Sequence, residues 1–390
     1  MIRRHLKIDA VDRNAAGAVM LGQRDQLKWR TVRCGCGGHG LAYANAVPLF
    51  KAFLCTASEP IVGNKHRSGD KIVQLWCIVS LNEAVPSRPN RAASGTMPYM
   101  KLDLDLVEET AKTLYIRALK ILPPDIKAGL ARLSAAESVP IAQRVLGTML
   151  SNIKVAEAND NLLCQDTGIP IYSVRIGRHV SFDGVELKQA IRRGCERATR
   201  EHPLRSSVVH PLTRANEHSS CGIEVPVIHL DFDERDGVLE IEMVPKGSGS
   251  ENNSFLRMAV PAEGIDAIKT FVVDCVIAAG GKTCPPTIVG VGIGGTSDLC
   301  VALAKRAGTR PLGSQCADPL GAQLEAQLSE AVNMLGVGPQ GLGGDATAFA
   351  VHIELAATHI TMNPVAVNMQ CHSARRARAT ISANGVTYGF

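Results

Sequence analysis

The sequence predicts a mixed α/β protein of the α+β type, with a helical lead-in followed by mixed β-sheets flanked by helices. Two observations support this fold class. Clean helical patterns fill residues 100–160, and strand-like and helical runs alternate through residues 161–390, with neighbouring strand runs that favour antiparallel pairs. Hydrophobic residues make up 45% of the 390 residues and charged residues 20%, which is typical of a globular protein.

Three helices are predicted in the lead-in. The first, over 102–122, has acids early and bases late, which suits the helix dipole, and its apolar residues recur every three to four positions. The second and third, over 123–133 and 138–160, each have a proline near the start, a position where proline is favoured.

The main part of the chain alternates between the two periodicities. Apolar runs rich in β-branched residues predict strands, and amphipathic runs predict helices. In order, the expected elements are a strand at 169–177, a helix at 185–201, strands at 225–232 and 238–245 joined by the turn DERDG as in a hairpin, a helix at 263–280, a strand at 287–293, helices at 297–308 and 320–335, and strands at 349–356 and 359–371.

Residues 1–99 differ from the rest of the chain. They hold both tryptophans, a Gly-rich RCGCGGHG stretch and no sustained period, and they end in a Pro/Ser/Arg linker at 85–99. Our preferred interpretation is an unmatched basic extension from a start codon placed too far upstream, with Met100 directly before the first helical pattern. Half a metal site at Cys34, Cys36 and His39, or an Arg-rich targeting segment, are weaker alternatives.

Charge and composition argue against nucleic-acid-binding, membrane-spanning and secreted proteins. Residues 1–99 carry 14 Lys/Arg and 6 Asp/Glu, a net of +8, which leaves 28 and 31, a net of −3, for the rest. A nucleic-acid face on the main domain is therefore not expected, and aromatic residues at 4% argue against base stacking. No apolar stretch reaches the roughly 18 residues of a membrane span, and no secretory signal core is seen. We expect a cytoplasmic protein that binds neither membranes nor nucleic acids.

Three of the twelve cysteines have a distinctive local setting. Cys164, Cys284 and Cys371 each end an apolar segment and precede turn chemistry or a polar cluster, whereas Cys275 and Cys300 lie inside apolar runs and are expected to be buried. Three thiolates can hold an iron–sulfur cluster by three corners and leave one iron open. Unrelated loop cysteines are the alternative, and spacing alone favours it.

The segment GVGIGG at 290–295 fits the dinucleotide-binding pattern G-x-G-x-x-G after an apolar strand. A lone match is weak, and the glycines alternatively allow close backbone contact with a neighbouring element. An NAD-dependent oxidoreductase therefore remains a distant alternative.

Five motifs together resemble one family. They are CQDTGIP at 164–170, KGSGSEN at 246–252, KTCPPTIVGVGIGGT at 282–296, RPLG at 310–313 and GPQGLGGD at 338–345. The likeness runs in order from about residue 100 to 380 and is to the α region of the iron–sulfur hydro-lyases, the class I fumarate hydratase and L(+)-tartrate dehydratase family. It implies that 161–390 is a cluster-binding catalytic α domain.

The resemblance also implies roles for single residues. Cys164, Cys284 and Cys371 match the ligands of a 4Fe-4S cluster with one open iron site, and Cys221 is treated as a non-ligand. Asp166 and His359 match catalytic acid–base or orienting residues. Four residues are expected to bind substrate: Gln165, Arg205, Gly247 and Gly249. Without the resemblance, a structural role would be favoured for each of three residues: a surface charge for Arg205, a core histidine for His359 and a turn residue for Asp166.

The implied reaction is reversible hydration of a C4 dicarboxylate. KGSGSEN resembles fumarate hydratases more than tartrate dehydratases, so fumarate to L-malate, a tricarboxylic acid cycle reaction, is the first choice and L(+)-tartrate to oxaloacetate the second. An open iron would act as a Lewis acid toward the leaving hydroxyl, and Arg205 would stabilise charge on the carboxylate. Two interpretations are open for the basic cluster of Arg375, Arg376 and Arg378. The cluster helps to bind acids, or it lies on a solvated helix face, which is the interpretation that we favour.

The resemblance implies a partner as well. Single-chain members carry a second domain after the α region, whereas only 19 residues follow Cys371 here. We therefore expect a separate β subunit that completes the active site, and an α2β2 assembly with a homodimeric α core.

Overall fold

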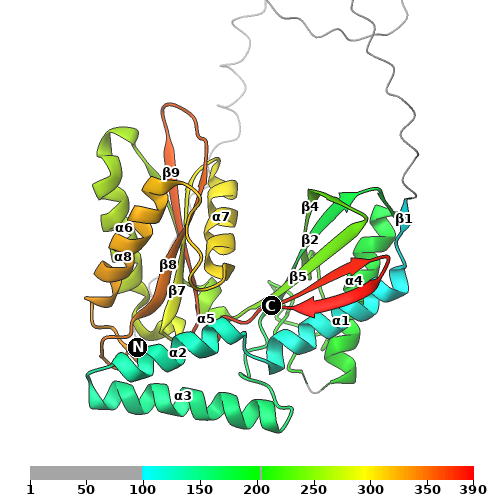
Figure 1. Ribbon diagram of the computed structural model, residues 1–390, viewed down its shortest axis with the longest axis horizontal. Coiled ribbons are helices and arrows are strands. Elements are labelled where there is room, and N and C mark those ends of the chain that lie inside the picture. Colours follow the sequence, from blue (N-terminus) through cyan, green and yellow to red (C-terminus); the bar gives the residue numbers. More distant parts are fainter. Residues whose placement is uncertain (1–98, 203) are drawn as a thin grey trace, which may run out of the picture. The chain divides into compact units, whose positions relative to one another are not determined.

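Two main β-sheets, one of five strands and one of four, organise the computed structural model, which describes residues 99–202 and 204–390 (Figure 1). Together with the surrounding helices they confirm the predicted mixed α/β class. The predictions made for the front end, among them the possible metal half-site at Cys34 and Cys36, lie outside the described residues.

The five-stranded sheet has the order β11-β10-β5-β2-β4. Only β2 and β4 run parallel, and the other neighbours are antiparallel. The strands are β2 (Ile169–Arg178), β4 (Val227–Asp236), β5 (Val238–Lys246), β10 (Ala377–Ser382) and β11 (Gly385–Gly389).

The predicted hairpin between β4 and β5 is wrong in its pairing, although both strands exist. Strand β2 lies between them and pairs with both. Side chains of β2 such as Tyr172 and Val174 are almost fully buried, so β2 suits the inside of the sheet, whereas β4 exposes most of its residues and suits the edge.

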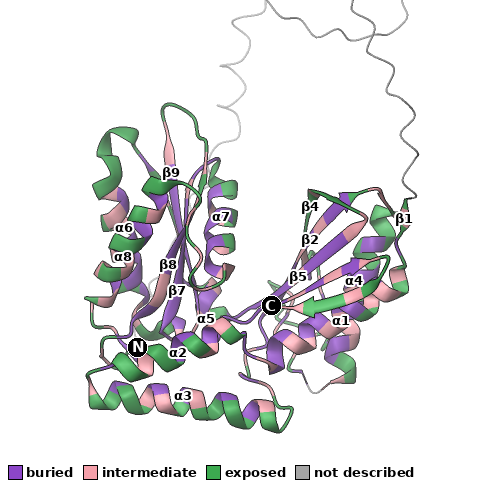
Figure 2. Cartoon of the chain, in the orientation of Figure 1, coloured by how far each residue is buried: buried purple, intermediate pink, exposed green. Residues whose placement is uncertain are grey.

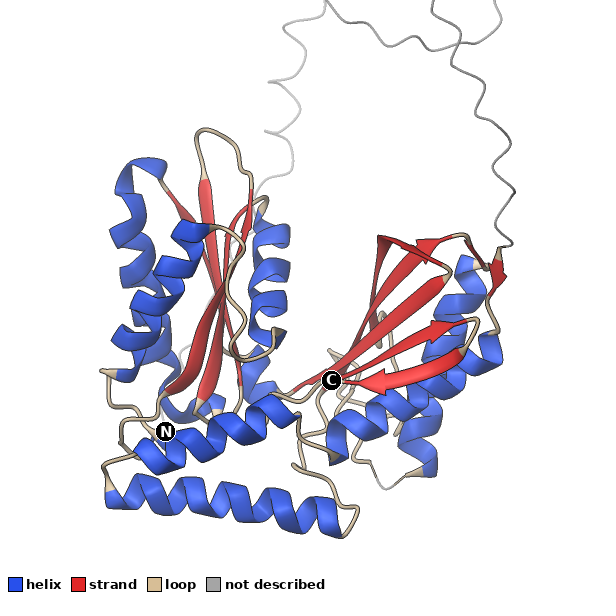
Figure 3. Cartoon of the chain, viewed as in Figure 1, coloured by secondary structure: helices blue, strands red, loops and turns tan. Residues whose placement is uncertain are grey.

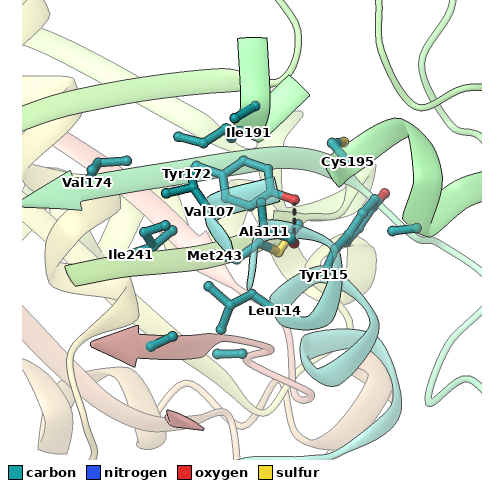
Figure 4. Close-up of a cluster of buried hydrophobic side chains, with 14 of the residues drawn as sticks. Val107, Ala111, Leu114, Tyr115, Tyr172, Val174, Ile191, Cys195, Ile241 and Met243 are labelled. Carbon is teal, nitrogen blue, oxygen red and sulfur yellow. Dashed lines mark hydrogen bonds between the residues drawn. The ribbon is translucent and has the colours of Figure 1, made fainter. Parts of the chain in front are cut away.

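Helices α1 (Leu104–Lys120) and α4 (Gly184–Glu201) pack against each other, and α1 packs on the five-stranded sheet. Asp103 and Asp183 cap them by accepting hydrogen bonds from backbone N–H groups of the first turn. Between helices and sheet, the hydroxyl of Tyr172 donates to the carbonyl of Ala111 at 3.1 Å (Figure 4). A two-residue pairing of β1 (Met100–Lys101) with β3 (Val180–Ser181) lies at the start of the described chain.

The four-stranded sheet has the order β6-β9-β7-β8, with β7 and β8 parallel. Helices α6 and α8 cover one face and α7 covers the other (Figure 3). The elements are β6 (Ser254–Ala259), β7 (Thr287–Gly294), β8 (Ala348–Ala356), β9 (Asn363–Gln370), α6 (Gly264–Ala279), α7 (Ser297–Thr309) and α8 (Pro319–Asn333). Its central strands β7 and β9 are buried along nearly their whole length (Figure 2).

Helices α2 (Pro124–Ala136) and α3 (Pro140–Ala158) pack together and confirm the predicted helical lead-in. Their buried side chains share a cluster with Ile288, at the start of β7, and with Ala374, just after β9. The lead-in thus supports the ends of the strands that flank the site. None of the helices in residues 99–202 and 204–390 is both long and apolar enough to span a membrane.

Candidate active site

Three loops that are far apart in sequence carry the cysteines singled out above. Cys164 precedes β2, Cys284 precedes β7 and Cys371 follows β9. Because Ile288 of β7 pairs with Gln370 of antiparallel β9, Cys284 and Cys371 lie at the same end of the four-stranded sheet. The backbone N–H of His372 donates to the carbonyl of Cys284 at 3.1 Å and joins the two loops directly.

The electrostatics of Cys284 bring the third cysteine to the same place. Burial raises the pKa of the Cys284 thiol, and Cys371, Cys164 and Asp166 raise it further. Contacts between the loops agree with this effect, because the N–H of Ser248 donates to Asp166 and a Cβ on Gly249 would lie 2.6 Å from the carbonyl oxygen of Lys282, two residues before Cys284. All three cysteines are half-buried, so they are neither sealed in the core nor free in solvent.

The backbone around Cys284 is held in an unusual conformation. Cys284 has φ 53° and ψ 63°, in the left-handed region that non-glycine residues seldom adopt and that clusters at functional sites. It ends the short 3₁₀ helix η2 (Gly280–Thr283). The GPQGLGGD motif supports this turn, because the N–H of Gln340 donates to the carbonyl of Pro285 at 2.8 Å.

Close packing explains glycine at position 281. A Cβ there would lie 2.9 Å from the carbonyl oxygen of Gln340. The two motifs therefore form one rigid support for the Cys284 loop.

Asp166 is fixed from two sides. Its Oδ1 accepts from the N–H of Gly168 at 3.0 Å, and its Oδ2 accepts from the N–H of Ser248 at 2.7 Å and from the Ser248 hydroxyl at 3.2 Å. Hydrogen bonds of this kind on both oxygens hold the carboxylate in one orientation. The CQDTGIP and KGSGSEN motifs are thus in direct contact.

The KGSGSEN segment contains the one-turn helix α5 (Ser248–Glu251). A Cβ on Gly247 would lie 2.9 Å from Asp166 Oδ2, and one on Gly249 would lie 2.6 Å from the carbonyl oxygen of Lys282. Both glycines were predicted to let a substrate approach the backbone. Their nearest neighbours in the structure are groups of the protein, so each also allows the segment to pack closely.

Lys246, the first residue of this segment, is a functional candidate that sequence reasoning missed. Its ammonium is buried and donates to Asn368 Oδ1 and Gln370 Oε1, each at 2.7 Å, and to the hydroxyl of Ser250. Burial lowers the pKa of Lys246 to about 8, while Glu251 acts in the opposite direction. The lysine therefore ties the KGSGSEN segment to the end of β9, next to Cys371. A lysine directly after a buried strand was the available signal.

Gln165 and Arg205 have exposed side chains next to this cluster of groups. Gln165 lies between Cys164 and Asp166 in the chain, and the hydroxyl of Thr167 donates to the carbonyl of Arg205. The Arg205 backbone is thus fixed to the loop that carries Asp166.

His359 lies far from the three cysteines of its own chain. It is exposed in the loop between β8 and β9, and its Nδ1 lies 2.8 Å from the hydroxyl of Thr361. Thr358 contacts the carbonyl of Gly295, beyond the far end of β7. The length of β7 therefore separates His359 from Cys284, a distance of about 23 Å at the usual rise per strand residue. The structure does not bring His359 to the three cysteines of its own chain.

The surroundings of the basic cluster, Arg375, Arg376 and Arg378, differ from the expected solvated helix face. Arg375 and Arg376 are 2% and 3% exposed, and Arg378 lies on strand β10, so the favoured solvated helix face is wrong. Arg376 donates to Asp125 at 2.7 Å and Arg378 to Glu242 at 3.0 Å. Periodicity could not reveal this, since the partners are more than 100 residues away in the sequence.

The surroundings of Cys221 and of the GVGIGG motif indicate packing roles. The Cys221 thiol donates to the carbonyl of Arg192 at 3.6 Å and interacts with Cys195. Gly290 and Gly292 lie inside strand β7, where a Cβ would meet the backbone of α7 at 2.1 Å. The glycines allow helix and strand to touch, and they do not form a phosphate-binding turn.

The donor set suits a cluster better than a single ion. Among the residues that the structure describes, no three His, Cys, Asp or Glu side chains are grouped to hold one metal ion. Thiolates on one ion lie within about 4 Å of each other, because each metal–sulfur bond is about 2.3 Å long. A four-iron cluster offers each thiolate its own iron, so three separate but neighbouring half-buried cysteines fit it.

The chain is similar to known proteins over most of its length. Residues 108–380 match the family model described as fumarate hydratase (Fumerase). The chain is 43% identical over 273 residues to the putative L(+)-tartrate dehydratase subunit alpha of Methanocaldococcus jannaschii, covering 70% of this chain and 96% of that protein. It is 32% identical over 263 residues to the L(+)-tartrate dehydratase subunit alpha of Escherichia coli K12, covering 67% and 86% respectively, and equally to that of Shigella boydii.

Proposed function

The chain belongs to the fumarate hydratase (Fumerase) family, and from this premise we propose that it is the α subunit of an iron–sulfur hydro-lyase. Its reaction is the reversible addition of water to a four-carbon dicarboxylate. The observation that supports the proposal is that contacts join the three cysteine loops: the N–H of His372 donates to the carbonyl of Cys284, and Asp166 in the Cys164 loop accepts from Ser248, whose neighbour Gly249 packs against Lys282.

Cys164, Cys284 and Cys371 are the proposed ligands of a 4Fe-4S cluster. When bound, such a cluster with one open iron supplies Lewis-acid chemistry toward a hydroxyl group. The remaining tasks fall to this chain's own side chains: to bind the carboxylates, to hold the substrate in one orientation and to move a proton.

Asp166 is the proposed acid–base residue. Its hydrogen bonds to Gly168 and Ser248 hold the carboxylate in one orientation, as proton transfer to a bound substrate requires. Gln165 and Arg205, exposed on the same loop and on its neighbour, are proposed to contact the substrate, and the charge of Arg205 would stabilise a carboxylate. Gly247 and Gly249 are proposed to allow the substrate to lie against the KGSGSEN segment.

His359 requires a second copy of the chain. Because the length of β7 separates it from Cys284 of its own chain, it is proposed to act in the site of another α subunit. This role agrees with the proposed homodimeric α core within an α2β2 assembly, which we expect in the cytoplasm.

Fumarate, with L-malate as the product, is the first substrate candidate, because of the KGSGSEN motif and the family model. L(+)-tartrate is the second, because the similar proteins from M. jannaschii and E. coli carry that name. A β partner is proposed for the same reason, since both are described as alpha subunits.

The test is activity of the complex prepared without oxygen. The chain is co-expressed with its β partner, and kcat/KM is measured for fumarate, L-malate and L(+)-tartrate. We expect turnover of one substrate pair by the complex and little by the chain alone. A complex that holds iron yet turns over none of the three would refute the proposal, and equal rates without the partner would refute the need for a β subunit.

A further inference from the structure

Arg375 is buried in the candidate site without a counter-charge. It is 2% exposed and among the largest fully buried side chains. Its Nε and Nη1 atoms are buried without a hydrogen-bond partner, and no carboxylate of residues 99–202 or 204–390 forms an ion pair with it. A guanidinium stays charged at every pH that a protein tolerates, so burial cannot be relieved by losing the proton.

The two neighbouring arginines show the contrast. Arg376 is equally buried but pairs with Asp125 at 2.7 Å, and Arg378 pairs with Glu242 at 3.0 Å. A buried charge without a partner is strongly unfavourable, whereas a paired one is tolerated. The surroundings of Arg375 are therefore incomplete until an anion arrives.

The remaining nitrogen of Arg375 faces the candidate site. Its Nη2 lies 3.8 Å from the point that a Cβ on Gly247 would occupy, and Asp166 Oδ2 lies 2.9 Å from the same point. Asp166 does not supply the counter-charge, because its oxygens accept from Gly168 and Ser248 and no ion pair with Arg375 forms. Gly247 thus borders a spot with a fixed carboxylate on one side and an uncompensated cation on the other.

We propose that Arg375 binds one carboxylate of the dicarboxylate substrate beside Gly247. The inference rests on the proposed function, and it assigns to Arg375 alone the acid binding that the sequence offered for its basic cluster as the less favoured interpretation. A planar guanidinium matches a carboxylate in shape and charge, and the low-dielectric surroundings strengthen the attraction.

The proposed thiolate-bound cluster would be another anion in this site. Nη2 of Arg375 lies beside Gly247 and Asp166 Oδ2, so the geometry favours a substrate carboxylate at this position.

The test uses the cluster-loaded complex of the chain with its β partner and the unreactive dicarboxylate succinate as the probe. Binding is measured by calorimetry, and iron content and the reduction potential are measured on the same samples. We expect Arg375→Met to weaken succinate binding about ten- to hundredfold, as loss of a charged hydrogen-bond partner does, and Arg375→Lys to restore part of it. Arg378→Gln is the matched control, since its charge is paired with Glu242, and it should change the affinity less than twofold.

A second readout separates binding from a structural role. Removing an uncompensated buried charge should leave the melting temperature of the unliganded complex unchanged or raise it, whereas removing a structural arginine lowers it. Unchanged succinate affinity in Arg375→Met, with a shifted potential or lost iron, would assign the residue to the cluster and overturn the inference. If Arg375→Met does not fold, full wild-type affinity in Arg375→Lys overturns it.

Failure of the proposed function gives a different result. In that case the wild-type complex itself holds no iron or binds no succinate. Wild-type binding together with unaffected Arg375 variants refutes only the inference about Arg375.

Discussion

Gly247 and Asp166, 81 residues apart in the sequence, are neighbours in space: a Cβ on the glycine would stand 2.9 Å from Oδ2 of the aspartate. Such a Cβ would be closer than ordinary van der Waals contact allows, and the same oxygen accepts a hydrogen bond from the N–H of Ser248 at 2.7 Å. The orientation of the proposed acid–base carboxylate therefore depends on the absence of a side chain at position 247.

The first prediction concerns this contact. Gly247→Ala should displace the Asp166 carboxylate and lower kcat by roughly 10²-fold or more, since acid–base groups contribute about 10²–10⁴-fold. Steady-state kinetics of the complex and its iron content are the measurements. Iron content should stay at the wild-type level, because the cysteine loops are not altered. Wild-type kcat in this variant would contradict a catalytic role for the Asp166 orientation.

The second prediction concerns the cluster ligands. After anaerobic reconstitution the protein should hold about four irons and absorb broadly in the visible range. Serine at position 164, 284 or 371 should remove most of both signals, because an alkoxide is a poor ligand for the cluster. Cys221→Ser is the control, since this thiol donates to the carbonyl of Arg192 and should leave iron content unchanged. Iron loss in Cys221→Ser with retention in Cys284→Ser would show the ligand set to be wrong.

The third prediction concerns His359. If it acts in the site of a second copy, His359→Asn and Cys284→Ser chains are each inactive alone but complement each other in one dimer. Purified mixed dimers should have about half of the wild-type activity, because each has one complete site out of two. Co-expression of two differently tagged chains with the β partner, followed by tandem purification and assay, measures this. No recovery in mixed dimers would exclude His359 from a shared site.

The fourth prediction compares two glycine substitutions in helices. In α4, a Cβ on Gly194 would lie 2.3 Å from the carbonyl oxygen of Glu108 in α1, whereas a Cβ on Gly147 in α3 would meet nothing within 4 Å. Gly194→Ala should lower the free energy of unfolding by about 1–3 kcal/mol through overpacking. Gly147→Ala should raise it by up to about 1 kcal/mol, because alanine favours a helix. Chemical denaturation of both variants gives the values, and equal effects would mean that α1 and α4 do not pack this closely.

The fifth prediction concerns acid stability. Burial lowers the pKa of His352 below its usual value of 6.5, and the nearby Arg310 lowers it further while Glu325 and Glu354 oppose the shift. The unfolded state therefore takes up a proton at higher pH than the folded state. Stability is fully present above about pH 6.5 and falls as the pH decreases, by at most about 1.4 kcal/mol per pH unit for this one group.

His352→Gln should flatten the acid side of the stability profile, as measured by denaturation between pH 5 and 7.5. The exposed His229 provides the control, and His229→Gln should leave the slope unchanged. An unaltered slope in His352→Gln would assign the acid sensitivity to other groups.

Much of the fold and part of the site were predictable. The first helix was visible because its acids lie early, its bases lie late and its apolar residues recur every three to four positions. The cysteine loops were visible because each ends an apolar segment beside an unusual motif. Strand pairing was not, because the position of β2 between β4 and β5 depends on which strand must be buried on both sides.

Long-range geometry was not predictable from the sequence. His359 is only twelve residues from Cys371, but the extended strand β9 lies between them, so the proposed role of His359 depends on a second copy of the chain. The burial of Arg375 and Arg376 depends on elements formed by other parts of the chain, and no local pattern records it.

The separation of the cysteines along the chain affects the order in which the protein can mature. Cys164 and Cys284 are 120 residues apart and Cys284 and Cys371 a further 87, so only long-range contacts bring them together. Such contacts form late, because the entropy of closing long loops must be overcome first. If the proposed cluster is bound, iron uptake should therefore follow folding of both sheets, and newly made chains would first pass through a stage in which the three thiols are accessible to oxidants. Loading with iron would then be a late step that reports whether the whole α domain has folded.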